Sequence, residues 1–306
     1  MNKTEFANYI KDQMEGMLEG ELEISVQEIC KNNGIMKTGL IVKDIRLNIA
    51  PTIYLDELFE EYQKGRPIDD VVKVVYRNLK NGMPKEKVDL DFFSDFEQVK
   101  DKICHRLVNY EKNQTTLEDV PHLPFLDLAI CFYYAFSDEM LGKGSILIRN
   151  SHAKKWGVTT SELWKIASEN TRKLYPEECF PMENMLMELM GMKEGKAKPE
   201  DIWEEAENDP EEHMMRVLTN QQRHFGASVI LYENLLGKLS DKLSGDLYII
   251  PSSIHEVLIL TKCEGEAEHL GEIIQEVNRE CIDPQEVLSD HLYLYDRGEK
   301  RMKIVS

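Results

Sequence analysis

The polar residues best suited to chemistry gather in the segment PSSIHE, at a predicted turn that enters a strand. They are Ser252, Ser253, His255 and Glu256. A serine nucleophile needs a base within hydrogen-bond reach and a third group that orients the base. Asp290 or His291 could supply that group if the chain folds back. Ser253, His255 and Asp290 are therefore the candidate catalytic residues.

The same segment has an ordinary structural interpretation. Pro-Ser-Ser is common turn chemistry, because serine hydroxyls bond nearby backbone groups. A serine and a histidine two residues apart also rarely face each other. Both interpretations stay open.

A second polar loop precedes Gly226, between two predicted strands. It holds Asn220, Arg223 and His224, which could contact a ligand or only close a hairpin. With the turn above, this loop supplies the candidate binding residues. They are Asn220, Arg223, Ser252 and Glu256.

Metal and cofactor chemistry have little support in the sequence. Cys104 and His105 with His122 could ligate a metal, but adjacent ligands with one distant third lack the spacing of known zinc sites. The six cysteines include no CxxC pair. The chain also has no GxxxxGK[ST], GxGxxG, HExxH, GxSxG or EF-hand motif. We therefore predict no metal site and no cofactor.

The charge balance narrows the class of partner. Asp and Glu number 56 against 37 Lys and Arg, which gives a formal net charge of -19. This field repels nucleic-acid phosphates and anionic lipids, and no basic run offsets it. We expect a protein partner, with no nucleic acid and no membrane. The charge by itself is most simply explained by solubility; a basic protein partner and mimicry of nucleic acid are the alternatives.

Scattered cysteines and the absence of a signal peptide favour a reducing cytoplasm. The longest apolar stretch, from Leu123 to Phe136, is interrupted by Pro124 and Asp127 and is too short to span a bilayer. We therefore expect a soluble protein.

Periodicity predicts an α+β chain whose first module covers residues 1–90. Apolar residues recur with helical spacing from Phe6 to Met17, then alternate with polar residues as in a strand. The expected elements are that first helix, a hairpin of strands at 22–30 and 39–42 around an Asn-Asn-Gly turn, and helices at 54–64 and 67–82.

Residues 91–306 are expected to form a larger α+β region. Thr159 and Glu162 form a capping box that should start a helix ending at Pro176. The other elements expected before residue 190 are a helix at 91–101 and strands at 102–110, 125–136 and 144–149. The acidic segment 191–212 is most simply a solvated linker; an acidic docking segment is the alternative.

The C-terminal pattern reads strand, strand, helix, and then repeats. The first unit has strands at 214–219 and 227–232 and a helix at 234–245. The second has strands at 247–250 and 257–260 and a helix through Leu270 and Cys281. Two ββα units predict a curved antiparallel sheet with helices on one face. A closing strand near 292–295 completes the chain.

Three of these segments resemble a known family: LTNQQRHFGASVILYENLL, DLYIIPSSIHEVLIL and VNRECIDPQEVLSDHLYLYDR. They are similar to an uncharacterised family of anaerobic gut bacteria, the domain-of-unknown-function family 5688, over nearly the whole chain. The resemblance implies no reaction. The positions that match its signature are Asn220, Gly226, Ala227, Pro251, Ser252, Ser253, His255, Glu256, Asn278, Pro284, Ser289 and Asp290.

The sequence thus favours a non-enzymatic protein-interaction or regulatory protein. Two alternatives are a hydrolase or transferase that uses Ser253, His255 and Asp290, and an acidic mimic of nucleic acid.

Overall fold

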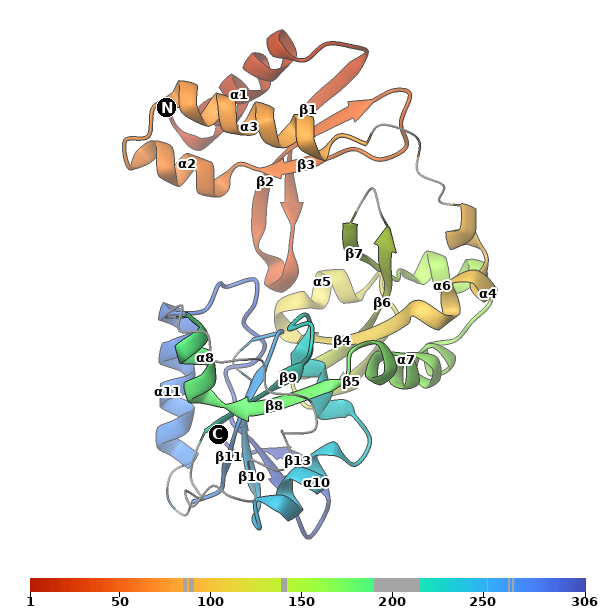
Figure 1. Cartoon of the computed structure of the whole chain (residues 1–306), viewed down its shortest axis with the longest axis vertical. Helices are drawn as coiled ribbons and strands as arrows, with labels where there is room; N and C mark the ends of the chain where they lie inside the picture. Colours follow the sequence, from red (N-terminus) through yellow and green to blue (C-terminus); the bar gives the residue numbers. More distant parts are fainter. Residues whose placement is uncertain are drawn as a thin grey trace. The chain divides into compact units, whose positions relative to one another are not determined.

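The computed structural model describes residues 1–84, 87, 91–138, 142–189, 215–251, 253–263, 265 and 267–306. The acidic segment 191–212 and Ser252 lie outside these residues. The chain divides into two compact units, Met1–Phe92 with Ser137–Gly142 and Phe93–Phe136 with Lys143–Ser306. Within the described residues all strand pairs are antiparallel and fall into three sheets, which confirms the mixed α+β class (Figure 1).

The first unit contains the predicted helices and hairpin. Asn2 and Glu5 exchange the two bonds of a capping box at the start of its first helix. Its elements are α1 (Lys3–Met17), β1 (Leu22–Cys30), β2 (Met36–Asp44), β3 (Thr52–Tyr54), α2 (Asp56–Gln63) and α3 (Ile68–Gly82). The strands pair in the order β1-β2-β3. The apolar stripes of α1 and α3 meet the sheet in a core that includes Phe6, Ile10, Leu40 and Leu79.

The second unit begins with a four-stranded sheet. Its strands are β4 (Ile103–Asn109), β5 (His122–Phe125), β6 (Leu128–Asp138) and β7 (Gly142–Leu147). The order is β4-β6-β5, with β7 also paired to β6. The short helices around them are α4 (Phe96–Val99), α5 (Gln114–Leu117) and α6 (Asn150–Trp156). The long helix α7 (Thr160–Leu174) starts at the predicted capping box of Thr159 and Glu162.

Two predictions in this part differ from the structure in their bounds or continuity. The strand expected at 125–136 is present as β6 but begins only at Leu128, because the chain reverses at Leu126, whose φ is 54°, and Phe125 ends β5. The helix expected at 91–101 is three short pieces, namely Asp91–Ser94, α4 and Lys100–Lys102. Asp95 caps α4 by accepting from the Glu97 amide.

A six-stranded sheet forms the rest of the second unit. Its order is β13-β12-β10-β11-β9-β8. The strands are β8 (Glu177–Pro181), β9 (Arg216–Asn220), β10 (Leu247–Ile250), β11 (Val257–Thr261), β12 (Tyr293–Asp296) and β13 (Arg301–Ile304). The helices are α8 (Met182–Leu189), α10 (Leu235–Lys242) and α11 (Ala267–Glu280).

Only the second of the two predicted ββα units is formed, by β10, β11 and α11. The strand expected at 227–232 is a 3-10 helix, Gly226–Leu231. A hairpin strand there would have to pair with β9, but β8 and β11 already occupy both edges of that strand.

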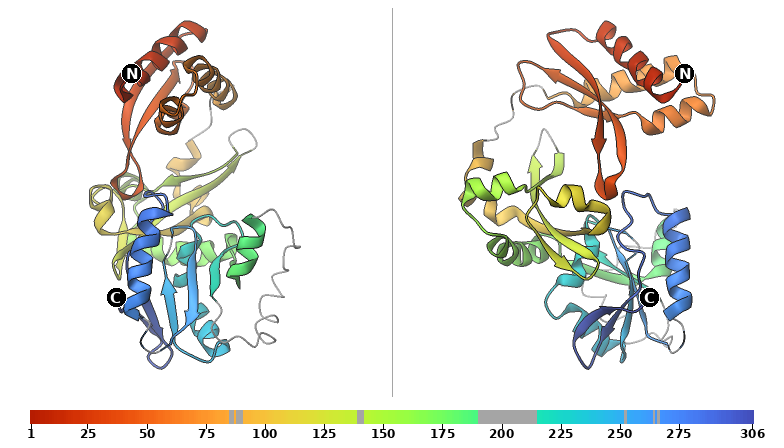
Figure 2. Two further views of the ribbon diagram at one scale, coloured as in Figure 1. Left: turned by 90° about the vertical axis from the view of Figure 1, so that its left-hand side faces the viewer. Right: turned by 180° about the vertical axis from the view of Figure 1, so that it is seen from behind.

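Helices contact both faces of the six-stranded sheet, so the prediction of one covered face is wrong. Helix α11 lies against one face of the sheet (Figures 1 and 2). Its Ile274 belongs to one apolar cluster with Tyr248 and Leu294. On the opposite face Gly237 of α10 lies beside Tyr295, because neighbouring strand residues point to opposite sides.

No helix in the part of the chain that the structure describes is long and apolar enough to cross a membrane.

Candidate functional site

The loop between β9 and the 3-10 helix is held in a strained conformation. Asn220 is buried, and its side-chain amide donates to the carbonyl of His224 at 2.9 Å. Its Oδ1 accepts from the amides of Gln222 at 3.1 Å and His224 at 3.3 Å. Arg223 and Phe225 have φ values of 50° and 52°. Bulky residues rarely adopt this left-handed conformation, so the surrounding structure must enforce it.

Gly226 allows this loop to press against the turn after β10. A Cβ there would lie 2.0 Å from Oγ1 of Thr219 and 2.3 Å from the carbonyl oxygen of His255. The Thr219 hydroxyl also donates to that carbonyl at 2.7 Å. Loop and turn thus form one surface. We call residues 220–226 with 253–256 the loop–turn surface.

The turn residues bond to one another. The Ser253 hydroxyl donates to Oε1 of Glu256 at 2.7 Å and accepts from the amide of His255 at 3.0 Å. Ser253 is only 3% exposed. The hydroxyl of Ser253 therefore donates to the Glu256 carboxylate and not to the imidazole of His255.

The ring of His255 binds the neighbouring loop. Its Nδ1 accepts from the strained amide of Phe225 at 3.3 Å, which places the proton of the neutral ring on Nε2. Nε2 lies 3.6 Å from Oε1 of Glu286. The Phe225 and His255 rings are nearly parallel, with centroids 6.0 Å apart. His255 thus braces the loop.

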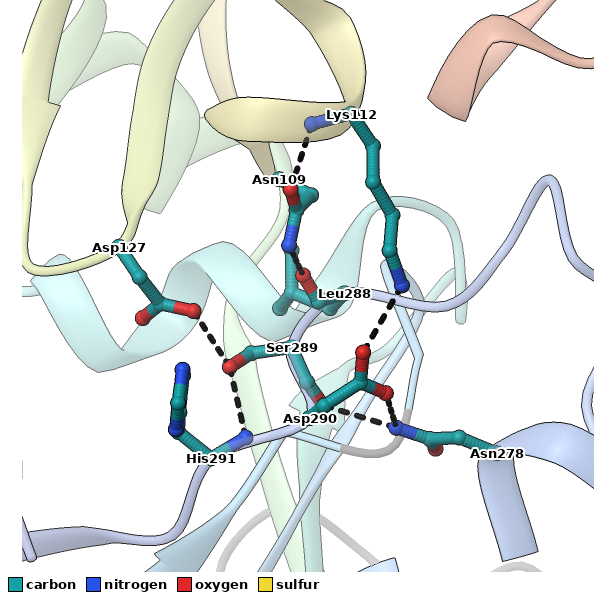
Figure 3. A network of polar contacts seen from close by, with 8 residues as sticks. All are labelled: Asn109, Lys112, Asp127, Asn278, Leu288, Ser289, Asp290 and His291. Carbon is teal, nitrogen blue, oxygen red and sulfur yellow. Dashed lines mark hydrogen bonds and ion pairs between the residues drawn. The ribbon is translucent and has the colours of Figure 1, made fainter. Parts of the chain in front are cut away.

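Asp290 belongs to a different network, shown in Figure 3. Its carboxylate accepts from the side chains of Asn278 at 2.9 Å and Lys112 at 3.0 Å. Burial opposes ionisation, but these hydrogen bonds outweigh it and hold the pKa of Asp290 below its usual range. Among the described residues no hydrogen bond or ion pair joins Asp290 to Ser253 or His255. The three candidate catalytic residues do not form a triad.

The residues around Asp290 connect the C-terminal segment to the four-stranded sheet (Figure 3). The Ser289 hydroxyl donates to Asp127 at 2.6 Å, and the amide of Asn109 donates to the carbonyl of Leu288 at 3.1 Å. Asn278 also donates to the Ser289 carbonyl at 2.8 Å. Three of the signature positions, Asn278, Ser289 and Asp290, therefore have a structural role.

Arg106 lies next to the loop–turn surface. It was not among the residues predicted from the sequence. Its guanidinium carbon is 4.8 Å from the centre of the Phe225 ring. Its Nε is buried without a hydrogen-bond partner. Burial lowers the pKa of His224, and the charges of His255 and Arg106 lower it further. The sequence signal that could have identified Arg106 is a charged residue inside the otherwise apolar strand ICHRLVN.

Arg223 anchors the loop. Its guanidinium pairs with Glu188 at 2.5 Å and Glu178 at 3.7 Å, and it lies 5.0 Å from the centre of the Phe180 ring. These contacts hold the loop against β8 and α8.

The residues considered as metal ligands, Cys104, His105 and His122, do not lie together in the structure. Cys104 and His105 are adjacent in β4 and point to opposite faces, and Nδ1 of His122 lies 3.0 Å from the carbonyl of Val120. Across the described ranges, no group of three or more His, Cys, Asp or Glu could hold a metal ion.

Comparison with known proteins gives a family and no activity. Neither the curated proteins nor the solved structures contain a significant match. One family model matches residues 3–297, and it confirms the resemblance seen in the C-terminal segments. The chain belongs to this family, which is described as a family of unknown function (DUF5688).

Proposed function

We propose that this chain is a non-enzymatic binding protein that contacts a protein partner through the loop–turn surface. The observation that carries the proposal is the conformation of Arg223 and Phe225, both held at positive φ in an exposed loop. Strain of this kind gathers at ligand-binding sites, where a fixed shape lowers the entropy lost on binding. Asn220 and Gly226 enforce that shape.

Two further features favour binding over hydrolysis. The Ser253 hydroxyl bonds to Glu256, and Asp290 is occupied by Asn278 and Lys112. A serine hydrolase would need these groups to converge on His255. The side chains of Gln222 and His224 are instead exposed at the rim of the surface, as recognition residues are.

We also propose a reducing compartment, the cytoplasm of a bacterium. None of the six cysteines, all of which lie in the described ranges, forms a disulfide, and Cys104, Cys131 and Cys179 are buried. Buried thiols of this kind behave as small apolar residues.

The test is affinity capture from bacterial lysate with quantitative mass spectrometry. The double variant Gln222→Ala/His224→Ala removes two exposed side chains of the surface. The control Gln275→Ala/His269→Ala removes the same residue types from the exposed face of α11. We expect the wild type and the control to enrich the same partner, and the surface variant to lose about tenfold, which corresponds to ~1.4 kcal/mol. Equal enrichment by both variants, or no reproducible partner, would refute the proposal.

A further inference from the structure

The guanidinium of Arg106 has no anionic partner among the residues that the structure describes. It makes no side-chain hydrogen bond or ion pair with any of them, and its Nε is buried, although the residue as a whole is partly exposed. Other arginines of the same unit have carboxylate partners: Arg149 pairs with Asp119, and Arg172 pairs with Glu177. Because Asp and Glu number 56 in this chain, a partly buried guanidinium without a carboxylate partner among the described residues is unexpected.

The surroundings of Arg106 are neutral. Cys131 lies opposite it across the β4–β6 ladder, and Phe225 lies at 4.8 Å. The Tyr133 ring packs edge-on against Phe225 at 5.3 Å. An aromatic face attracts a guanidinium but cannot satisfy its five N–H donors. Buried charges are normally paired, so the site calls for an oxyanion.

Solvent reaches the loop–turn surface next to Arg106. Arg106 as a whole keeps intermediate exposure, and the neighbouring His224 is exposed. The side chain of His255 is 24% exposed. A ligand group is therefore expected to approach from the side of His224 and His255.

The charge of the site matches a singly charged group. One guanidinium supplies a single positive charge, and His224 is neutral at pH 7 because its pKa is lowered. Glu256 and Glu286 lie around His255 and disfavour a dianion. A planar guanidinium fork also matches the two oxygens of a carboxylate.

We propose that Arg106 binds a carboxylate group presented by the protein partner, as a side chain or as a chain terminus. This inference rests on the proposed function and names the chemistry that the loop–turn surface recognises. Phe225 and Tyr133 form the neutral wall of the site, and His224 and His255 form its mouth.

The first test uses the wild-type protein and small probes. Acetate, acetamide and inorganic phosphate are titrated while proton–nitrogen NMR spectra follow the Nε–H of Arg106 and the amide of Phe225. We expect acetate to shift both signals to saturation, and acetamide, which has the same shape without the charge, to leave them in place. Equal effects of acetate and acetamide, no saturable shift, or tighter binding of phosphate would overturn the proposal.

The second test uses variants of Arg106. Arg106→Gln is expected to weaken acetate binding at least tenfold, and Arg106→Lys, which keeps the charge but loses the fork, by several-fold. Removal of an unpaired buried charge leaves the fold intact, which the dispersion of the same spectra verifies. The matched control Arg149→Gln changes a surface arginine and should bind acetate as the wild type does. Unchanged binding by Arg106→Gln contradicts the inference.

The two proposals fail in different ways. If Arg106→Gln loses acetate but captures the same partner as the wild type, the carboxylate inference is wrong and the proposed function stands. If acetate binds and neither wild type nor variants capture a partner, the proposed function is wrong, and the inference about the partner falls with it.

Discussion

His105 and Arg106 are neighbours in β4, yet their polar groups meet different environments. His105 is 1% exposed and lies between the rings of Trp164 at 5.3 Å and Tyr232 at 6.2 Å. Its Nδ1 is buried without a hydrogen-bond partner. Burial lowers the pKa of His105 to about 3, so the ring stays neutral in the folded protein.

This buried imidazole makes stability depend on pH. The unfolded chain binds a proton at His105 near pH 6.5, whereas the folded chain does so only near pH 3. The stability from this group is therefore complete above pH 6.5 and is lost as pH falls toward 3, by up to ~1.4 kcal/mol per pH unit.

We expect His105→Phe, which keeps an aromatic ring in the same packing, to remove this loss. Urea unfolding at pH 7.5 and 5.5 measures this loss of stability. The wild type should lose about 1.4 kcal/mol more than the variant between these two pH values. Equal losses in both proteins would show that His105 is not the responsible group.

Gly226 is the residue on which the loop–turn surface depends. The Cβ of Gly226→Ala would meet the Thr219 hydroxyl and the His255 carbonyl, and the carbonyl is backbone that cannot rotate away. We expect the free energy of unfolding to fall by about 2–3 kcal/mol in chemical denaturation. The matched control is Gly16→Ala in α1, where a Cβ meets no atom within 4 Å. The control should be neutral or slightly stabilising. Similar losses in both variants would contradict the close packing at Gly226.

At the scale of elements, Asn278 links α11 to the chain segment that follows it through hydrogen bonds. Asn278 is buried, and its amide donates both to the Ser289 carbonyl and to the Asp290 carboxylate. Lys112 binds the other oxygen of Asp290. A helix, a connecting segment and the four-stranded sheet thus share one polar network (Figure 3).

Removal of Asn278 should loosen this connection. Asn278→Ala removes the side-chain donor to the carbonyl of the buried Ser289 and to one carboxylate oxygen of Asp290, which costs about 1–3 kcal/mol in urea unfolding. The control Asn8→Ala lies on the exposed face of α1 and should cause no loss. Amide hydrogen exchange should also quicken in the C-terminal turns of α11 and at residues 289–292. Unchanged exchange at both places would mean that the network contributes little.

At the scale of the whole molecule, each compact unit has its own apolar core. Leu79 of α3 is buried with Phe6 and Val75 in the first unit. Leu239 of α10 is buried in the second unit. A unit with its own core is expected to unfold as a cooperative body.

Core truncations should therefore act within one unit. Leu79→Ala should lower the stability of the first unit by about 3 kcal/mol, and Leu239→Ala should do the same to the second. Hydrogen exchange with mass spectrometry should show faster exchange only in the truncated unit. Equal acceleration in both units by either variant would show that the molecule unfolds as a whole.

Short-range chemistry was sufficient to predict most elements from the sequence. The capping box of Thr159 and Glu162 starts α7, and the alternation of Leu22, Ile24 and Val26 lies in β1. These signals act over a few residues, so they survive in the folded protein. The segment 227–232 was misjudged because a short apolar run is consistent with a strand or a helix, and only the occupied edges of β9 exclude the strand.

The sequence by itself determined the α+β class, the family and the polar segments at Asn220 and Ser253. The tertiary structure alone decided which charges have partners. Asp290 meets Asn278 and Lys112, whereas Arg106 meets the Phe225 ring and no carboxylate of the described residues. The reason is physical: charge pairing and pKa depend on distances of a few ångströms between segments far apart in the chain, and these distances follow from the packing of whole sheets and helices.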